Sequence, residues 1–143
     1  METNVGGVFS AERATRWARP LFAAHVSAGF PSPAEDYIEG RLDLNRHLIK
    51  HPVATFYVRV SGDSMIDAGI HPDSILVVDR AVEADDGDIV IARLGDELCV
   101  KRLSIRDGRL WLVPENATYE PFEVTEEMDF EVWGRVMHSI RSY

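Results

Sequence analysis

Two residues far apart in the sequence have the side chains that nucleophilic catalysis needs. Ser64 follows a Gly-Asp turn in the segment SGDSMIDAGI, and Lys101 lies in the segment ELCVKRL. A serine hydroxyl becomes a good nucleophile when a base removes its proton, and a lysine can be that base if burial keeps its amine neutral. Ser64 and Lys101 are therefore a candidate nucleophile and general base.

Ser64 also has a purely structural interpretation. It could cap a helical turn, with the carboxylate of Asp67 completing a capping box. The segment GDSMI does not match the G-x-S-x-G nucleophile elbow, because Ile66 stands where the second glycine would be. The sequence thus argues against an α/β-hydrolase, and the capping and nucleophile interpretations both stay open.

Alternation along ELCVKRL separates Lys101 from its neighbour Arg102. Successive side chains of a β-strand point to opposite faces, so Lys101 shares a face with Cys99 and Leu103. Apolar surroundings disfavour a charged ammonium group. We expect Lys101 to lie on an apolar face and Arg102 to point away from Ser64, which would make Arg102 an internal control. A solvated strand lysine is the ordinary alternative.

Six segments after Pro52 predict a mostly β protein. They are rich in β-branched, aromatic and alternating apolar residues, which is typical of strands. Turn signals such as Gly95-Asp96 and Asp107-Gly108 separate them. We therefore expect a compact antiparallel β domain. The segments are TFYVRV, SILVVD, DIVIARL, ELCVKRL, RLWLVPE and FEVWGRVMHSIR.

The beginning of the chain differs from the rest. Residues 11–19 favour a helix, and the short apolar stretch LFAAHVSAGF follows Pro20. Residues 32–35, with the sequence SPAE, have the pattern of a helix start, so short helical turns are expected to about Lys50. The sequence predicts a flexible N-terminal arm over residues 1–28 and a β domain over residues 29–143.

Composition narrows the possible functions. Hydrophobic residues make up 45% of the 143 residues and charged residues 27%, as in ordinary globular proteins. The formal net charge of −9 argues against direct binding to nucleic acid, where affinity comes largely from Lys and Arg. No run approaches the roughly 20 apolar residues that span a bilayer. Cys99 is the one cysteine, which favours a reducing compartment, the cytoplasm.

No metal or cofactor is expected. His47 and His51 have the spacing of two ligands on one helix face, but the glutamate of H-E-x-x-H is missing and Pro52 ends any helix there. The acidic residues 85–88 are expected to form a turn, because their spacing does not fit an EF-hand.

Three longer segments resemble a known family. GFPSPAEDYIEGRLDLN, HPVATFYVRVSGDSMIDAGI and GDIVIARLGDELCVKRL are similar to the UmuD family and, more loosely, to the C-terminal domain of the LexA repressor. The resemblance begins near Gly29 and continues to the C-terminus. It implies the LexA/UmuD peptidase fold and a self-cleaving serine peptidase, in which Ser64 is the nucleophile and Lys101 the general base.

The resemblance also implies the bond that is cut. The family cuts between a small residue and glycine, just before a Phe-Pro step, which here falls on Ala28-Gly29. Well-known UmuD proteins have Cys-Gly at this place and LexA has Ala-Gly, so this chain agrees with LexA. We expect Ser64 to attack the Ala28 carbonyl, with the backbone N–H groups of Ser64 and Asp63 binding the oxyanion.

The function that the resemblance implies is a role in the SOS response to DNA damage. The trimmed chain would be the accessory subunit of an error-prone, UmuC-like translesion polymerase, cleavage would be triggered by a RecA filament, and the protein would be a homodimer. A LexA-type or phage-type repressor needs a longer arm for its DNA-binding domain, and a signal peptidase needs a membrane segment. A non-catalytic interaction module is disfavoured by the presence of both Ser64 and Lys101.

Overall fold

The computed structural model describes residues 17–23, 25–31 and 38–143. The chain forms two compact units, Met1–Leu48 and Ile49–Tyr143, and each is described by itself. The expected helix start at residues 32–35 lies outside the described residues, and so does most of the helix-prone stretch at residues 11–19.

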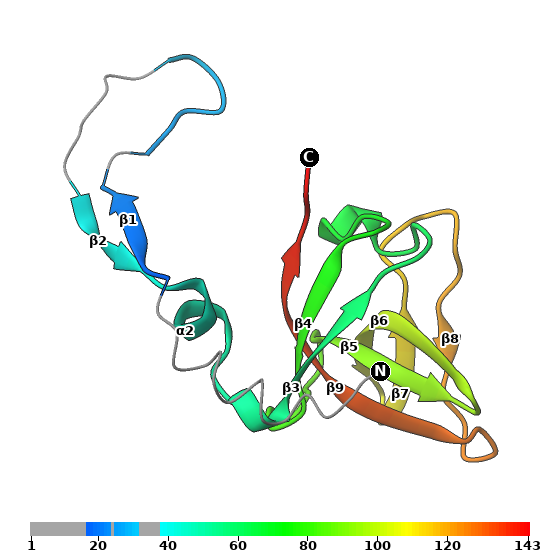
Figure 1. Ribbon diagram of the computed structural model, residues 1–143. Helices are drawn as coiled ribbons and strands as arrows, with labels where there is room; N and C mark the ends of the chain where they lie inside the picture. The colour runs from blue at the N-terminus through cyan, green and yellow to red at the C-terminus, as the bar shows by residue number, and fades with distance from the viewer. Residues whose placement is uncertain (1–16, 24, 32–37) are drawn as a thin grey trace. The chain divides into compact units, whose positions relative to one another are not determined.

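The first unit contains a two-stranded antiparallel sheet (Figure 1). Strand β1, Arg19–Phe22, pairs with β2, Ile38–Leu42, and helix α2, Leu44–Leu48, follows. The expectation of helical turns up to Lys50 is therefore confirmed for α2 and wrong for residues 38–42. There, hydrogen bonding to β1 overrides a local helix preference, which is only a weak influence on the final structure.

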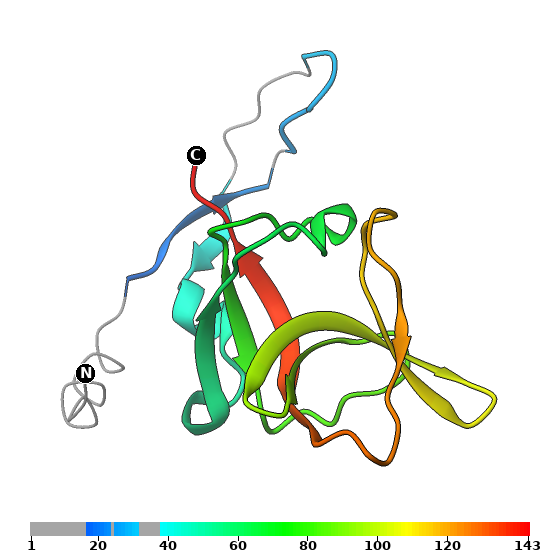
Figure 2. The same cartoon turned by 90° about the vertical axis from the view of Figure 1, so that its right-hand side faces the viewer.

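The second unit is built on one seven-stranded sheet with the order β3-β4-β9-β5-β6-β7-β8. All neighbouring strands are antiparallel, which confirms the predicted fold class. The sheet is strongly curved (Figures 1 and 2). Six strands coincide with the six predicted segments, and the short β8 was not predicted. The strands are β3 Thr55–Arg59, β4 Ile75–Asp79, β5 Ile89–Leu94, β6 Glu97–Arg106, β7 Arg109–Val113, β8 Phe122–Glu123 and β9 Phe130–Ile140, with 3-10 helices η1 Pro52–Ala54 and η2 Ile66–Ala68.

Both faces of the sheet bury apolar side chains. Along β5, Ile91 packs in one cluster, whereas Val90 and Ala92 pack in the other, as the alternation of a strand requires. The curvature of the sheet thus produces two clusters around β5, which is the strand that pairs with β6 and its Lys101. The buried members are Val60, Met65, Ile70, Leu76, Val78 and Ile91 in the first cluster, and Val90, Ala92, Leu103 and Leu112 in the second.

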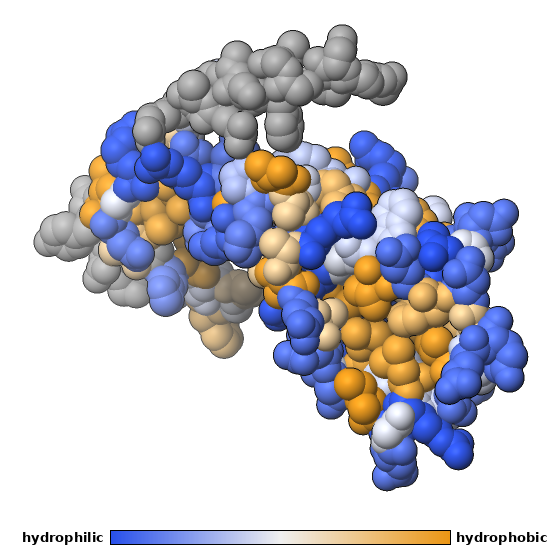
Figure 3. Space-filling model, turned by 90° about the horizontal axis from the view of Figure 1, so that it is seen from below, coloured by the Kyte–Doolittle hydropathy of each residue, from blue (hydrophilic) through white to orange (hydrophobic). Residues whose placement is uncertain are grey.

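Within the second unit, the residues packed around the second cluster are only partly buried. Residues such as Leu94, Leu110 and Phe130 pack against it while keeping part of their surface in contact with solvent. Figure 3 shows apolar side chains gathered on one face of this unit, with charged and polar residues around them. The unit therefore exposes a continuous apolar area as well as isolated apolar residues.

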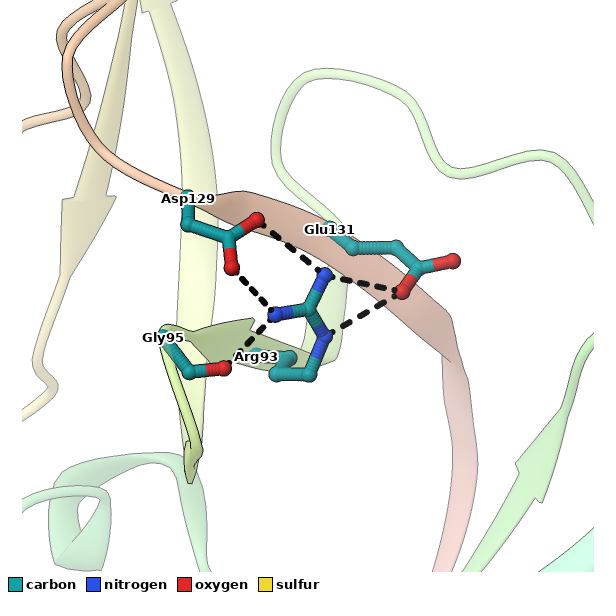
Figure 4. Close-up of polar contacts among 4 residues, drawn as sticks. All are labelled: Arg93, Gly95, Asp129 and Glu131. Carbon is teal, nitrogen blue, oxygen red and sulfur yellow. Dashed lines mark hydrogen bonds and ion pairs between the residues drawn. The ribbon is translucent and has the colours of Figure 1, made fainter.

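The hairpin that leads into β6 is fixed by Arg93 (Figure 4). The Arg93 guanidinium donates to the Gly95 carbonyl at 2.6 Å, to Asp129 at 3.1 Å and to Glu131 at 3.2 Å. Gly95 lies in the turn between β5 and β6, and the two carboxylates lie at the start of β9. Single surface ion pairs contribute little, but this network holds the turn in one place relative to β9.

Candidate active site

The loop between β3 and β4 carries Ser64. It turns at Gly62, whose φ of 81° is a left-handed conformation that favours glycine. Met65, the residue after Ser64, is 1% exposed and belongs to the first apolar cluster. The buried Met65 side chain anchors this nucleophile loop, residues 61–70, and Ser64 is left partly exposed at the surface of the unit.

Ser64 does not cap a helix. The 3-10 helix η2 has Met65 as its N-cap and no side-chain capping bond. The backbone N–H of Asp67, which a capping box would direct to Ser64, instead donates to the Glu115 carbonyl at 2.8 Å. The capping-box interpretation is therefore wrong, because a neighbouring loop satisfies the donor and leaves the Ser64 hydroxyl free for another partner.

That partner is Lys101 on β6. Its Nζ donates to Ser64 Oγ at 3.0 Å and to the Val100 carbonyl at 3.2 Å. Lys101 is opposite the fully buried Val90 of β5 and is itself half-buried. Within the described residues, Lys101 has no carboxylate within 4.0 Å. The structure thus joins two residues that are 37 positions apart.

Arg102 points away from the Ser64 hydroxyl, as expected, but it is coupled to the nucleophile loop. Its Nε donates to Glu115 Oε1 at 2.9 Å. The backbone N–H of the same glutamate donates to the Ser64 carbonyl at 2.8 Å. The use of Arg102 as an internal control stays a prediction, although Glu115 links Arg102 to the nucleophile loop.

The loop between β7 and β8 is the part of the site that sequence reasoning missed. In Figure 2 this loop lies beside the segment that contains η2, and its residues Glu115, Asn116 and Tyr119 all bond to the nucleophile loop. Pro114 and Glu115 end the predicted strand segment RLWLVPE, and the residues after them, NATYE, are of types that are common in turns, so no short-range signal indicates these contacts.

The backbone donors on either side of the Asp63–Ser64 step are among those of the nucleophile loop that have no partner in the described residues. The N–H groups of Asp63 and Ser64 make no hydrogen bond to any other described residue. Unoccupied N–H groups beside a nucleophile are what an oxyanion site requires. Both residues were expected to supply such donors.

Cys99 lies two positions before Lys101 on the same strand. It packs, half-buried, against the second apolar cluster. Burial raises the pKa of its thiol, while the nearby charge of Lys101 acts in the opposite direction. Its environment is that of a small apolar residue, because a thiol needs a lowered pKa to be reactive near neutral pH.

Ala28 and Gly29 belong to the first unit, which is described separately from Ser64. Both residues are exposed, and the Gly29 N–H donates to the hydroxyl of Ser27 at 3.1 Å. Val26 is 94% exposed and Phe30 is 92% exposed. The peptide bond between Ala28 and Gly29 is therefore accessible within its own unit.

His51 and the acidic turn at residues 85–88 have structural partners. His51 Nδ1 lies 2.6 Å from Asp79 Oδ2, and the Asp85 N–H donates to the Asp88 carboxylate at 2.8 Å, as expected for a turn. In the described part of the chain, no three His, Cys, Asp or Glu side chains are grouped as they would be around a metal ion. No described helix has the length and apolar character needed to cross a membrane.

A serine bonded to a lysine on an antiparallel β domain fits the class of serine peptidases. Residues 20–137 match the Peptidase S24-like family, and the chain belongs to that family.

Three known proteins are similar to this chain over most of its length. Protein ImpA of Escherichia coli is 54% identical over 124 residues, which cover 87% of this chain and 84% of that protein. Protein SamA of Salmonella typhimurium is 46% identical over 86% of this chain and 87% of that protein. The LexA repressor of Bordetella parapertussis is 40% identical over 82% of this chain but only 54% of the repressor.

These comparisons confirm the resemblance to the UmuD family, with LexA as a more distant relative. The chain is a UmuD-like, self-cleaving serine peptidase of the SOS mutagenesis group. Membership of the UmuD family implies a UmuC-type partner in general terms.

Proposed function

We propose that Ser64 and Lys101 are the catalytic pair and that they cut the Ala28-Gly29 bond of this chain. The observation that carries the proposal is the 3.0 Å contact between Lys101 Nζ and Ser64 Oγ. This distance is within the range that proton transfer to a general base requires. When the amine is neutral, the same contact passes the serine proton to nitrogen.

The reaction then has two stages. Ser64 Oγ attacks the carbonyl carbon of Ala28, and its proton moves to Lys101 Nζ. The N–H groups of Ser64 and Asp63 bind the oxyanion, and Lys101 returns the proton to the departing amine of Gly29. Water then attacks the acyl-enzyme, which frees the carboxyl group of Ala28 and restores the Ser64 hydroxyl.

This cut would divide the chain into an arm, residues 1–28, and a peptidase domain, residues 29–143. It would remove β1 and leave β2 without its partner. Every strand of the seven-stranded sheet comes after residue 49, so the trimmed form would keep the whole fold of the second unit. The proposal is thus compatible with a stable product.

The trimmed form would act as the accessory subunit of a UmuC-like translesion polymerase in the cytoplasm. A RecA filament would trigger the cut by stabilising the conformation in which the arm occupies the site. The net charge of −9 supports a partner, and not this chain, as the holder of DNA. A homodimer of the uncut chain is supported by the exposure of Leu21, Phe22 and Val26 in the arm, at 40%, 58% and 94%.

The test is mass spectrometry of the purified full chain, incubated from neutral to alkaline pH with and without RecA, an ATP analogue and single-stranded DNA. A product that begins at Gly29 should accumulate faster as pH rises, because only the neutral amine accepts a proton, and the filament should accelerate it. Ser64→Ala should yield none of it. The same product from Ser64→Ala would show that another residue is the nucleophile.

A further inference from the structure

Backbone hydrogen bonds join the nucleophile loop to the loop between β7 and β8. The Glu115 N–H donates to the Ser64 carbonyl, and the Asp67 N–H donates to the Glu115 carbonyl, both at 2.8 Å. Arg102 holds the Glu115 side chain at 2.9 Å. This backbone contact fixes the chain after Ser64.

Two side chains from the same loop fix the residue before Ser64. Asn116 Nδ2 donates to the Asp63 carbonyl at 3.0 Å. The Tyr119 hydroxyl donates to Asp63 Oδ1 at 2.6 Å. Asp63 is therefore held both by its backbone and by its carboxylate, from residues more than 50 positions away.

The geometry of the peptide bond transmits this restraint to Ser64. The carbonyl of Asp63 and the N–H of Ser64 belong to one planar unit and point in opposite directions when the bond is trans. A bond from Asn116 to that carbonyl therefore sets the direction of the Ser64 N–H. That N–H makes no hydrogen bond to another described residue, so it is free to bind a developing charge.

We propose that Asn116 and Tyr119 are positioning residues that orient the Ser64 N–H as a preorganised oxyanion donor. The inference rests on the proposed role of Ser64 as nucleophile. Donors that are already aligned stabilise a developing oxyanion without reorganising during the reaction, and the complete loss of one such donor costs about 10²- to 10³-fold in rate. The contribution of Asn116 should be a part of that effect.

Asn116→Asp is the sharpest variant, because it breaks one bond and keeps another. Asn116 Oδ1 accepts the Thr118 N–H at 3.0 Å, and an aspartate oxygen can still do so. The aspartate cannot donate to the Asp63 carbonyl. Self-cleavage of the full chain should slow about 10- to 100-fold at each pH, while the shape of the rate-against-pH curve and the melting temperature stay unchanged.

Asn116→Ala shows whether slower cutting comes from the lost hydrogen-bond donor, from the lost turn bond to Thr118 or from the charge that Asn116→Asp adds. It loses both bonds without introducing a carboxylate, and it should also slow cutting at least about tenfold. If only the turn mattered, Asn116→Ala would be slow and Asn116→Asp would cut at the wild-type rate, which would overturn the proposal. Asn45→Asp, which adds the same charge in the first unit, is the matched control and should cut normally.

Tyr119→Phe removes only the hydroxyl that holds Asp63. We expect cutting to slow about three- to tenfold, less than for Asn116, because the tyrosine acts on the side chain and not on the peptide itself. Tyr57→Phe is the control, since Tyr57 is half-exposed on β3 and its hydroxyl has no partner among the described residues. Equal rates for Tyr119→Phe and Tyr57→Phe would remove Tyr119 from the proposal.

A spectroscopic measurement separates positioning from general stability. In the background of Ser64→Ala, which prevents cutting, Asn116→Asp should shift the backbone amide resonance of residue 64 and leave those of β9 in place. An unmoved resonance would overturn the proposed orientation. If Ser64→Ala itself still cut, the proposed function would fail, whereas a dead Ser64→Ala with a fully active Asn116→Asp would refute only this inference.

Discussion

The two units of the chain differ in how they are held together. In the second unit, Leu76, Val78 and Val90 are 0% exposed, and the sheet packs on both faces. In the first unit, every residue of β1 is exposed, Leu42 is the only partly covered residue of β2, and α2 buries none. One unit has a core, whereas the described part of the other is held mainly by strand pairing.

This difference matches the demands on an enzyme and on its substrate. Catalytic side chains need supporting residues that lock their geometry, and the proposed pair, Ser64 and Lys101, has them on the nucleophile loop and on β6. A peptide bond that is to be cut must be able to adopt a different conformation in the site. Segments with few buried contacts open at low free-energy cost, and the proposed cleavage site, Ala28-Gly29, lies in such a segment.

The largest expected effect tests the catalytic side of this comparison. Lys101→Arg keeps a positive charge, but a guanidinium stays protonated at accessible pH and cannot accept the serine proton. Self-cleavage should fall by about 10³-fold or more, since a general base contributes about 10²- to 10⁴-fold. Mass spectrometry of the incubated chain measures the loss. Lys50→Arg, at an exposed position, should cut normally, and equal activity of both variants would exclude Lys101 as the base.

The next effect concerns stability and should separate the two units. Met65→Ala empties a site that is 1% exposed, and the free energy of unfolding should fall by about 2–5 kcal/mol. Leu21→Ala, at 40% exposure in β1, should change it by less than about 0.5 kcal/mol. Denaturant unfolding followed by tryptophan fluorescence measures both. Equal losses would contradict the contrast between a packed and an unpacked unit.

Alanine substitutions at two glycines, one in a strand of each unit, should give a smaller difference in stability. A Cβ at Gly134 of β9 would lie 2.8 Å from Val78 Cγ1 and 3.0 Å from the Asp79 carbonyl, so Gly134→Ala should destabilise the protein by about 1–3 kcal/mol. A Cβ at Gly40 of β2 would meet nothing within 4 Å. Gly40→Ala should be neutral or stabilising by up to about 1 kcal/mol, since it restricts the unfolded chain. A cost at Gly40 comparable to that at Gly134 would show that β2 is packed more tightly than described.

The sequence predicted the second unit well, because its core imposes alternation on the strands. ELCVKRL and DIVIARL each coincide with a strand, and Lys101 lies on the expected one. It predicted the first unit poorly. Strands β1 and β2 bury no side chain, so no alternating pattern marks them, and a helix was expected over residues 38–42.

The candidate site was predictable only in part, for a similar reason. Residue types and the family resemblance drew attention to Ser64 and Lys101, but local sequence could not decide between a cap and a nucleophile. The choice between these two roles of Ser64 depends on the tertiary contact that places Lys101 of β6 beside the nucleophile loop. The contact of Asn116 with Asp63 spans 53 positions and involves residue types that are common in turns, so it has no signature in a single sequence.

The smallest expected effect is a pH dependence of stability at Tyr119. The hydrogen bond to Asp63 raises the pKa of Tyr119, and the charge and slight burial act in the same direction. A raised pKa in the folded state means that folding favours the protonated hydroxyl. The contribution of this hydrogen bond to folding stability is therefore fully present below the ordinary tyrosine pKa of about 10. It is lost as pH rises through the higher pKa that Tyr119 has in the folded protein.

Melting temperatures of wild type and Tyr119→Phe, compared from pH 8 to about pH 11.5, test this contact. The variant lacks the ionising group, and all other groups titrate equally in both proteins. The higher melting temperature of wild type should therefore shrink toward that of the variant only above about pH 10. The difference in melting temperature between wild type and Tyr57→Phe is the baseline for an exposed tyrosine. If the wild-type advantage over Tyr119→Phe followed that baseline at every pH, the hydroxyl would not hold Asp63 in solution. The nucleophile loop would then be less firmly fixed than the rest of the second unit, and closer in character to the first.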